Sequence, residues 1–377
     1  MQNNFPFDKI IVKPSDIDLK YSPLRRNLNS VTYVLGAFNP GMTRLPNNNI
    51  LIMVRIAEAL KTPIYDNKVH SIRWDSSNAY VLDGYNIDDV EMSDPRSFSL
   101  KKYFPMVVDA LTSISWLLPI ELTFDGKEII KIHYDKIISP SKSYQEYGIE
   151  DARISLINGK YLMTTCSVSS ERQSTTLYSS ENGLDYFLEG IILDHQNKDM
   201  ILFEGLINNK FYALTRPLGI SYLSTPPESN FNPGPSINLA ESPDALHWKP
   251  LDEPLIRSGK GKFFSLKLGG GAQPILTPKG WFVLFHGVEK NGEIGIYRTY
   301  WALLDKNEPW KILFLDTKNP VLTSKPILTE HLSDDIYIKN VVFTTGVVDN
   351  GNNLILASGE LDLCTRITHI SKSKFNI

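Results

Sequence analysis

The sequence predicts an all-β protein, a single five-bladed β-propeller that spans residues 1–377. Five segments of similar design recur along the chain, and each reads as a turn followed by a strand. Helical periodicity is weak throughout, and no Pro- or Ser-rich linker divides the chain. Repeated antiparallel units of about 50 to 70 residues suit blades that bury their faces against neighbouring blades. The alternative is two β-sandwich domains, which the missing linker disfavours.

Each of the five segments begins with a turn rich in Asn, Gly or Pro and continues as a hydrophobic, aromatic or β-branched run. All but the second end near a polar or ionisable residue, namely Arg55, Arg216, His286 or Glu360. Because inner strands of a propeller line a central channel, we expect the residues at and just beyond these ends to converge on one axial pocket. The five segments cover residues 45–55, 156–165, 206–216, 277–287 and 348–360.

Residues 60–140 interrupt the pattern of repeated turn-and-strand segments. They place extra apolar and charged segments between the first and second repeats. We interpret them as an insertion between the first two blades. A surface for a partner is the other reading, so the sequence leaves a homo-oligomer open.

Composition and charge point to a globular protein that acts on a small molecule. The net charge is only -3 with dispersed Lys and Arg, which argues against a nucleic-acid partner. Cys166 and Cys364 form no CxxC pattern, so we expect free buried thiols. The first residues show no secretory signal, which together with the thiols predicts a cytoplasmic protein. The apolar stretch 112–122 is too short to cross a membrane.

Motifs for metal and nucleotide binding are missing from the sequence. The seven histidines are scattered without an HExxH or similar ligand spacing. The glycine run 269–271 leads into no helical pattern, so it is not a nucleotide loop. We therefore expect a reaction without a metal or organic cofactor.

The stretch 148-GIEDARIS-155 concentrates charge where a loop passes into an apolar strand. Glu150 and Asp151 stand three and two residues ahead of Arg153. On these residues alone a solvated turn is the simpler interpretation. The expected convergence of polar strand ends changes this, because Asp151 then enters the axial pocket from the second blade. Carboxylates and bases that converge in a funnel indicate a reaction site.

These phrases resemble glycoside hydrolase family 130, the inverting β-mannoside phosphorylases and hydrolases. The similarity runs from about residue 36 to about residue 362 and is weakest across 60–140. No single phrase is decisive, but their order and spacing are specific. The matching phrases are 38-FNPG-41, 53-MVR-55, 150-EDARI-154, 197-NKDMILF-203, 213-ALTRP-217, 239-LAESPDALHW-248, 267-KLGGGAQPI-275, 281-WFVLFHG-287 and 359-GELD-362.

The resemblance implies a five-bladed propeller and assigns roles to individual residues. Asp151 matches the proton donor of the family, whose proton is thought to pass through a sugar hydroxyl. The resemblance implies that Asn39, Arg55 and Asp362 hold the mannosyl unit. We add Glu150 and Arg153, the charged neighbours of Asp151, as candidate substrate-binding residues. The implied phosphate-binding set is Lys198, Arg216, Lys267 and His286, all of them basic residue types.

Three positions depart from the family pattern. Ala152 replaces the usual proline, and 203-FEG-205 replaces Phe-Pro followed by a charged residue. Glu360 stands where a small residue is usual. These departures bear on the acceptor sugar more than on the chemistry.

The basic set favours phosphorolysis over hydrolysis. An inverting hydrolase uses one carboxyl group as the acid and a second as the base that activates water. A phosphorylase needs no base, because inorganic phosphate is its nucleophilic co-substrate, and it needs cations to hold that anion. The alternative is a β-mannosidase with Glu204 as the base, and a second alternative is a carbohydrate-binding propeller without catalysis. The sequence leaves a β-1,2 or β-1,4 linkage open.

Overall fold

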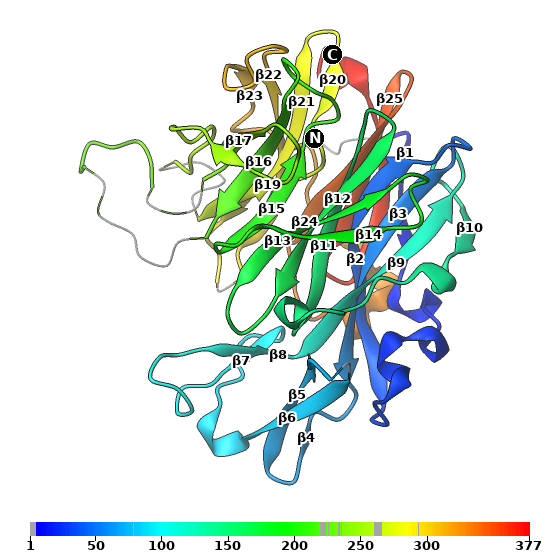
Figure 1. The fold of residues 1–377 in the computed structure, drawn as a ribbon, viewed down its shortest axis with the longest axis vertical. Helices are drawn as coiled ribbons and strands as arrows, with labels where there is room; N and C mark the ends of the chain where they lie inside the picture. Colours follow the sequence, from blue (N-terminus) through cyan, green and yellow to red (C-terminus); the bar gives the residue numbers. More distant parts are fainter. Residues whose placement is uncertain are drawn as a thin grey trace.

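The protein is built almost entirely from β-strands (Figure 1). The computed structural model describes residues 5–77, 79–218, 224, 226–232, 234, 236–259, 266–292 and 294–377. The helices in these ranges are short 3-10 turns. They are η1 (Pro14–Asp16), η2 (Leu19–Tyr21), η3 (Pro23–Arg26), η4 (Ile87–Asp89), η5 (Tyr134–Lys136), η6 (Ser143–Gln145), η7 (Pro326–Leu328), η8 (Glu330–Asp335) and η9 (Lys372–Lys374).

The largest sheet joins two antiparallel groups of strands edge to edge. Its only parallel contact among the described residues is the pair Ser115–Gly148, which connects β9 to β11. The first group contains β2 (Thr32–Arg44), β3 (Ile50–Leu60), β9 (Ser113–Leu122) and β10 (Ile129–Ile132). The second contains β11 (Gly148–Ile157), β12 (Lys160–Val168), β13 (Gln173–Ser180) and β14 (Phe187–Leu193).

Three further antiparallel groups follow along the chain. The third is β15 (Asn197–Leu202), β16 (Phe211–Pro217), β17 (Asn238–Ser242) and β18 (Lys249–Pro250). The fourth is β19 (Lys267–Gly270), β20 (Ile275–Thr277), β21 (Gly280–Glu289), β22 (Ile296–Leu304) and β23 (Ile312–Leu315). The fifth is β24 (Val342–Asn350), β25 (Asn353–Glu360), β26 (Cys364–Ser371) and the N-terminal β1 (Phe7–Val12).

The segment between β3 and β9 forms two small sheets of its own. One contains β4 (Ile64–Tyr65), β5 (Lys68–Trp74) and β6 (Tyr80–Asn86), and the other pairs β7 (Ser97–Ser99) with β8 (Asp109–Leu111). We call residues 61–112 the extension. Figure 1 shows it below the other strand groups. β9 and β10 also fall within 60–140, but they continue the first group.

The five repeated segments of the sequence occupy the same place in each group. Each corresponds to a hairpin turn and the second strand of its group, which is β3, β12, β16, β21 or β25. The first strands are β2, β11, β15, β19 and β24, and they lie toward the centre. β2 contacts both β24 and β11, while β15 contacts both β11 and β19. Residues near the ends of these first strands therefore come close together.

Hydrophobic clusters fill the spaces between consecutive groups. Leu51 and Met53 of the first group pack with Ile154 and Met163 of the second. Similar clusters join the second group to the third, the third to the fourth and the fourth to the fifth. A further cluster joins the fifth group back to the first. Alternate residues of each strand thus face one neighbour or the other, as period-2 side-chain geometry requires.

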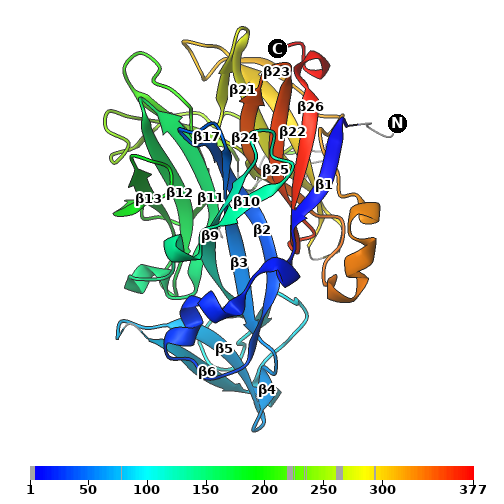
Figure 2. The same cartoon turned by 90° about the vertical axis from the view of Figure 1, so that its right-hand side faces the viewer.

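The chain ends meet in the fifth group. β1 pairs antiparallel with β26, with Phe7 opposite His369 and Asp8 opposite Thr368. Figure 2 shows β1 alongside β26. The first and last strands of the chain thus belong to one sheet.

Candidate active site

One pocket gathers charged side chains from the first strands of several groups. It encloses ≈ 180 Å³. Eight of its residues are ones that the sequence analysis assigned, seven of them to substrate or phosphate and Asp151 as the proton donor. The lining consists of Asn39, Arg55, Arg96, Asp151, Lys198, Asp199, Arg216, Lys267, His286, Tyr297, Val341, Phe343 and Asp362.

Three pocket residues sit in bulges of the first strands. The backbone is left-handed at Asn39 (φ 47°), Asp151 (φ 52°) and Asp199 (φ 59°). The pairing register of β2, β11 and β15 shifts at these same places. A bulge inserts an unpaired residue and redirects its side chain. Asn and Asp tolerate the left-handed conformation better than most residues, which explains why these types stand there.

Asp151 lies in a strongly positive environment. Its Oδ1 accepts hydrogen bonds from Asn39 Nδ2 at 3.0 Å and from Arg55 Nη1 at 3.1 Å. Burial alone would raise the pKa of this carboxyl, but the charges of Arg55, Arg153 and Lys198 outweigh it and lower the pKa to about 2. The side chain is therefore ionised at neutral pH in the free protein.

Glu150 and Arg153 are both buried and contact residues that line the pocket. The buried Glu150 carboxylate accepts hydrogen bonds from Arg55 Nη2 at 2.8 Å and Lys198 Nζ at 3.1 Å. Arg153, only 1% exposed, donates to the backbone oxygens of Gly271 and Asp151, both at 2.6 Å. Neither residue lines the pocket. Both form hydrogen bonds with residues that do line the pocket.

Asp199 is the buried counter-ion of the basic set. Its Oδ2 lies 2.8 Å from Arg216 Nη2 and 3.9 Å from His286 Nε2. Its Oδ1 accepts from Arg153 Nη2 at 3.4 Å. Burial opposes the charge of Asp199, but Arg216, His286 and Arg153 lower its pKa below the ordinary value. Sequence analysis missed this residue, although it stands next to Lys198 in a matching phrase.

The four members of the predicted phosphate set do meet in the pocket, but His286 is not a cation. Burial and the nearby charges of Arg216 and Lys267 lower its pKa to about 3, despite the opposing effect of Asp199. The imidazole is neutral at physiological pH and offers hydrogen bonds instead of charge. Lys267 Nζ lies 5.2 Å from the centre of the Tyr297 ring. Positive charge comes from Lys198, Arg216 and Lys267.

Two polar atoms of this set are buried without a partner among the described residues. They are Arg216 Nε and His286 Nδ1. Buried polar atoms are rarely left unpaired in native proteins. Both belong to residues that line the pocket, so a bound anion would give them partners.

The glycine run is explained by packing against the same cluster. A β-carbon on Gly269 would lie 2.5 Å from Asp199 Oδ2 and 2.9 Å from Arg216 Cδ. On Gly270 it would lie 2.9 Å from the backbone oxygen of Asp199. Side chains at these positions would displace Asp199 and Arg216. The glycines therefore make room for the charged cluster.

Asp362 faces Arg55 and Asp151 from the turn between β25 and β26. Leu361 (φ 58°) and Asp362 (φ 48°) both have left-handed backbones. Burial raises the pKa of Asp362 to about 6, although Arg55 and Arg96 favour its ionised form. A carboxylate of this kind is a good acceptor for sugar hydroxyl groups.

Arg96 reaches the pocket from the extension and was not predicted. Its guanidinium forms two hydrogen bonds with Asp94, from Nε at 3.0 Å and from Nη2 at 2.8 Å. This paired geometry fixes the orientation of the side chain. No repeat or motif marked Arg96, because it stands in the segment where the family resemblance is weakest.

A second cavity of ≈ 360 Å³ adjoins the pocket. Three chain segments contribute neighbouring residues to both. Pro95 lines the second cavity, and the next residue, Arg96, lines the pocket. Likewise Asn340 lines the second cavity and Val341 the pocket. Gly295 of the cavity likewise stands near Tyr297 of the pocket. The full lining of the second cavity is Ser93, Asp94, Pro95, Asn291, Ile294, Gly295, Lys339 and Asn340.

Glu204 does not line the pocket. It follows the far end of β15, whose near end carries Lys198, and its Oε1 accepts from Leu156 N at 3.3 Å. Burial raises the pKa of Glu204 to about 7. The expected alternative base is therefore placed away from Asp151, because five residues, four of them in β15, separate it from Lys198.

No group of three or more His, Cys, Asp or Glu residues in the described ranges is arranged to hold a metal ion. No helix in these ranges has the length and apolar character needed to cross a membrane. Cys166 and Cys364 are both free and buried, as expected.

Comparison with known proteins adds independent observations. The model of glycoside hydrolase family 130, described as beta-1,4-mannooligosaccharide phosphorylase, matches residues 112–375. The chain is 30% identical over 337 residues to the beta-1,2-mannobiose phosphorylase of Listeria innocua serovar 6a, with 87% of each sequence covered. It is also 30% identical over 247 residues to the 1,2-beta-oligomannan phosphorylase of a Thermoanaerobacter species, covering 63% of this chain and 73% of that relative.

A solved structure agrees with these sequence matches. The Listeria innocua beta-1,2-mannobiose phosphorylase in complex with beta-1,2-mannobiose is similar with a TM-score of 0.79 at 26% identity. The match covers 97% of this chain and 95% of that one. The similarity therefore includes the extension and all five strand groups.

Proposed function

This chain belongs to glycoside hydrolase family 130, and on that premise we propose that it is an inverting β-mannoside phosphorylase that produces α-mannose 1-phosphate. One observation carries the proposal. A single pocket holds the Asp151 carboxylate together with an anion site made by Lys198, Arg216 and Lys267. A water nucleophile would need none of these three cations.

The proposed substrate is a β-1,2-linked mannoside. Two relatives that are 30% identical to this chain bear the names beta-1,2-mannobiose phosphorylase and 1,2-beta-oligomannan phosphorylase. The β-1,4 linkage in the description of the family model is the alternative. Asn39, Arg55 and Asp362 would hold the mannosyl unit through its hydroxyl groups.

In the reaction, a phosphate oxygen attacks the anomeric carbon from the face opposite the leaving group. The glycosidic bond breaks, and the leaving oxygen takes the proton of Asp151 through a sugar hydroxyl. One carboxyl group is enough, because phosphate is already an anion. Lys198, Arg216 and Lys267 hold it in line, and neutral His286 adds a hydrogen bond.

Phosphate binding would also prepare the acid. In the free protein the cations around Asp151 keep its pKa at about 2. A phosphate anion seated on Lys198 and Arg216 offsets part of that positive field, which raises the pKa of Asp151. Binding of phosphate thus favours the protonated form of Asp151, which is the form that can donate a proton.

The leaving sugar would lie toward the extension. Arg96 stands at the junction between the pocket and the second cavity, and Asp94 holds it there. The lining of the second cavity combines the neutral polar residues Ser93, Asn291 and Asn340 with apolar and charged ones, and a sugar offers both hydroxyl groups and apolar C–H faces to such a surface. Glu204 is not among the lining residues of either cavity.

The alternatives have less support. As a hydrolase base, Glu204 would have to act on water beside Asp151, yet it lies outside the pocket. A binding module without catalysis would have no use for an acid beside an anion site. The reaction as proposed uses inorganic phosphate as co-substrate and no cofactor.

We also propose that the five strand groups are the blades of a five-bladed β-propeller. The hydrophobic clusters between consecutive groups, including the one between the fifth and the first, support this arrangement. The whole chain is then one catalytic domain with an extension between the first two blades. A cytoplasmic location is part of the proposal, since the sugar phosphate is kept where it is made.

Product analysis tests the function. Purified protein is incubated with β-1,2-mannobiose with and without phosphate, and the products are identified by NMR. We expect α-mannose 1-phosphate only when phosphate is present. Free mannose released at the same rate without phosphate would establish a hydrolase instead. β-1,4-mannobiose, run in parallel, distinguishes the linkages.

A further inference from the structure

Glu360 does not line the pocket, whereas Asp362, two residues further on, does. Its carboxylate is completely buried. Oε1 accepts a hydrogen bond from the backbone N–H of Lys325 at 2.6 Å, and Oε2 accepts from Arg366 Nη1 at 2.9 Å. This position is one where the family resemblance leads us to expect a small residue. The carboxylate is therefore a feature of this chain that needs its own explanation.

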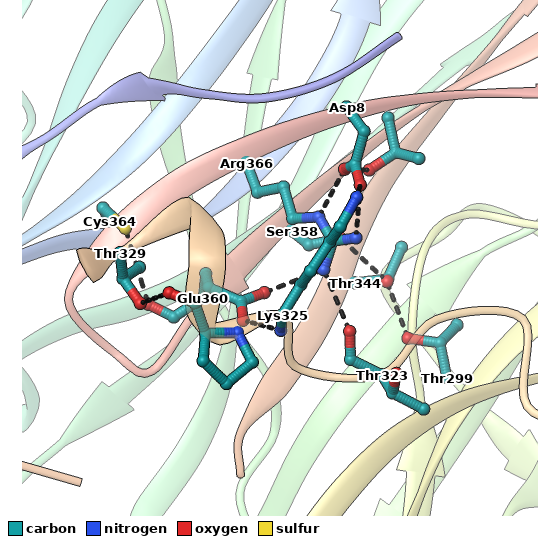
Figure 3. Close-up of polar contacts among 12 residues, drawn as sticks. Asp8, Thr299, Thr323, Lys325, Thr329, Thr344, Ser358, Glu360, Cys364 and Arg366 are labelled. Atoms are coloured by element: carbon teal, nitrogen blue, oxygen red, sulfur yellow. Dashed lines mark hydrogen bonds and ion pairs between the residues drawn. The ribbon is translucent and has the colours of Figure 1, made fainter. Parts of the chain in front are cut away.

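Arg366 connects Glu360 to the first strand of the protein. Its Nε and Nη2 donate to the two oxygens of Asp8 at 2.7 and 3.0 Å. Its Nη1 also donates to the backbone oxygen of Thr323 at 3.0 Å. Figure 3 shows Arg366 between Asp8 and Glu360. Arg366 is only 1% exposed, so its guanidinium depends on these partners.

Lys325 and Thr368 complete the network. Lys325 Nζ lies 2.9 Å from Asp8 Oδ2, and Thr368 Oγ1 donates to Asp8 Oδ1 at 3.0 Å. Two carboxylates, Asp8 and Glu360, thus face two cations, Lys325 and Arg366. Such a network is neutral and has its hydrogen bonds made, which is the condition under which buried charges are tolerated. We call these four residues the clasp.

The clasp is joined through Glu360 to the turn that carries Asp362. Glu360 is the first residue of this turn, and the N–H of Leu363 donates back to its backbone oxygen at 3.1 Å. Leu361 N donates to the backbone oxygen of Val341 at 2.9 Å, and Tyr337 Oη donates to that of Asp362 at 2.7 Å. The side chain of Glu360 anchors one end of the turn, and these contacts hold the rest. These contacts fix the backbone of Asp362, whose side chain lines the pocket.

We propose that Glu360 is a positioning residue for sugar binding, which acts through the turn on Asp362, and that Asp8 of β1 supports it through Arg366. The proposal rests on the proposed function, in that Asp362 holds the mannosyl unit. It makes the first strand of the chain part of the support of the pocket. Phosphate contacts come from other groups of strands, so they are independent of the clasp.

The test compares Glu360→Ala with the matched control Glu121→Gln. Glu121 is a buried carboxylate that accepts hydrogen bonds from Asn49 and His133 in the first strand group. In Glu360→Ala we expect KM for the mannoside to rise roughly tenfold or more, because a displacement of about 1 Å costs that much in an active site. KM for phosphate stays within about twofold. In Glu121→Gln both KM values stay unchanged, whatever happens to its Tm.

A second variant covers the case in which Glu360→Ala does not fold. Glu360→Ala with Arg366→Leu removes both charges, so no buried charge of this pair is left unpaired. The same selective rise in mannoside KM is expected. Parallel changes in both KM values, or no change in a folded variant, would overturn the positioning role.

A crystal structure of Glu360→Ala separates this proposal from the proposed function. We expect the Asp362 carboxylate to move by about 1 Å or more, and an unmoved carboxylate would refute the positioning role. If the wild-type protein turns over no mannoside, the proposed function fails, and the position of Asp362 still decides whether the clasp orients it.

Discussion

Asp151 and Arg55 come from neighbouring strand groups and meet at 3.1 Å. The same guanidinium holds Glu150 at 2.8 Å, so one cation orders two adjacent carboxylates that point in different directions. Glu150 joins Arg55 to Lys198, whereas Asp151 lines the pocket. The pair of carboxylates that looked like a charged turn in the sequence thus has two separate roles.

Replacing Asp151 with Asn should abolish the proton transfer. The amide keeps the shape and the hydrogen bonds but carries no transferable proton, so we expect kcat to fall by at least about a hundredfold. Steady-state phosphorolysis and a thermal melt measure the effect. Asp83→Asn, which alters the ion pair with Arg73 in the extension, is the matched control. Near-normal turnover in folded Asp151→Asn would place the acid elsewhere.

Truncating Arg216 to Ala should weaken phosphate binding selectively. The change removes contacts to one substrate only, so KM for phosphate should rise by about tenfold or more, while KM for the mannoside stays within about twofold. Asp199→Asn should act in the same direction because Asp199 orients Arg216 at 2.8 Å. Arg298→Ala, at an ion pair with Glu289, is a control outside the pocket. Equal changes in both KM values would contradict the assignment.

The pH dependence of mannoside binding should report Asp362. Its pKa is raised to about 6, mainly by burial, so the carboxylate loses its charge as pH falls through about 6. We therefore expect kcat/KM for the mannoside to decline below that pH. Asp362→Asn should lower activity and remove this part of the profile. The ionisation of the phosphate substrate affects the wild type and Asp362→Asn equally. Only the difference between their two pH profiles is therefore assigned to Asp362.

The same raised pKa makes a prediction about stability. The folded protein binds the Asp362 proton more tightly than the unfolded chain, so stability from this group falls as pH rises from 3.8 to about 6. Above that range the cost of burying the charge is constant. Asp362→Asn should therefore have a higher Tm than the wild type at neutral pH but not in acid. Thermal melts of both proteins across this pH range test the prediction. A lower Tm for Asp362→Asn than for the wild type at neutral pH would contradict it.

Glu204→Gln should leave phosphorolysis nearly unchanged. Its carboxyl group lies outside the pocket, and burial already favours its neutral form. We expect kcat within about twofold of the wild type, measured by phosphate consumption. Loss of activity in this variant, together with mannose release in phosphate-free buffer, would revive the hydrolase with Glu204 as its base.

Arg96→Ala should affect the mannoside and not phosphate. If Arg96 contacts the sugar at the mouth of the pocket, KM for the mannoside should rise by about tenfold. Arg73→Ala removes a comparable ion pair in the same extension and serves as the control. A rise in KM for phosphate alone would move Arg96 to the anion site.

The sequence by itself determined the β architecture and most of the pocket. Turn residues before β-branched and aromatic runs identified the second strand of every group, because hairpin turns and period-2 alternation are local properties. Arg55, Arg216 and His286 followed from their places at strand ends. Asn39, Asp151 and Asp362 followed from phrases that resemble the family.

Only the tertiary structure decided how these residues are used. The neutral state of His286 depends on burial and on charges from three other segments. The entry of Arg96 and the exclusion of Glu204 depend on where the extension and the end of β15 lie. The bond between Asp8 and Arg366 joins residues 358 positions apart. No local pattern records such contacts, because they arise when distant segments are brought together in the folded chain.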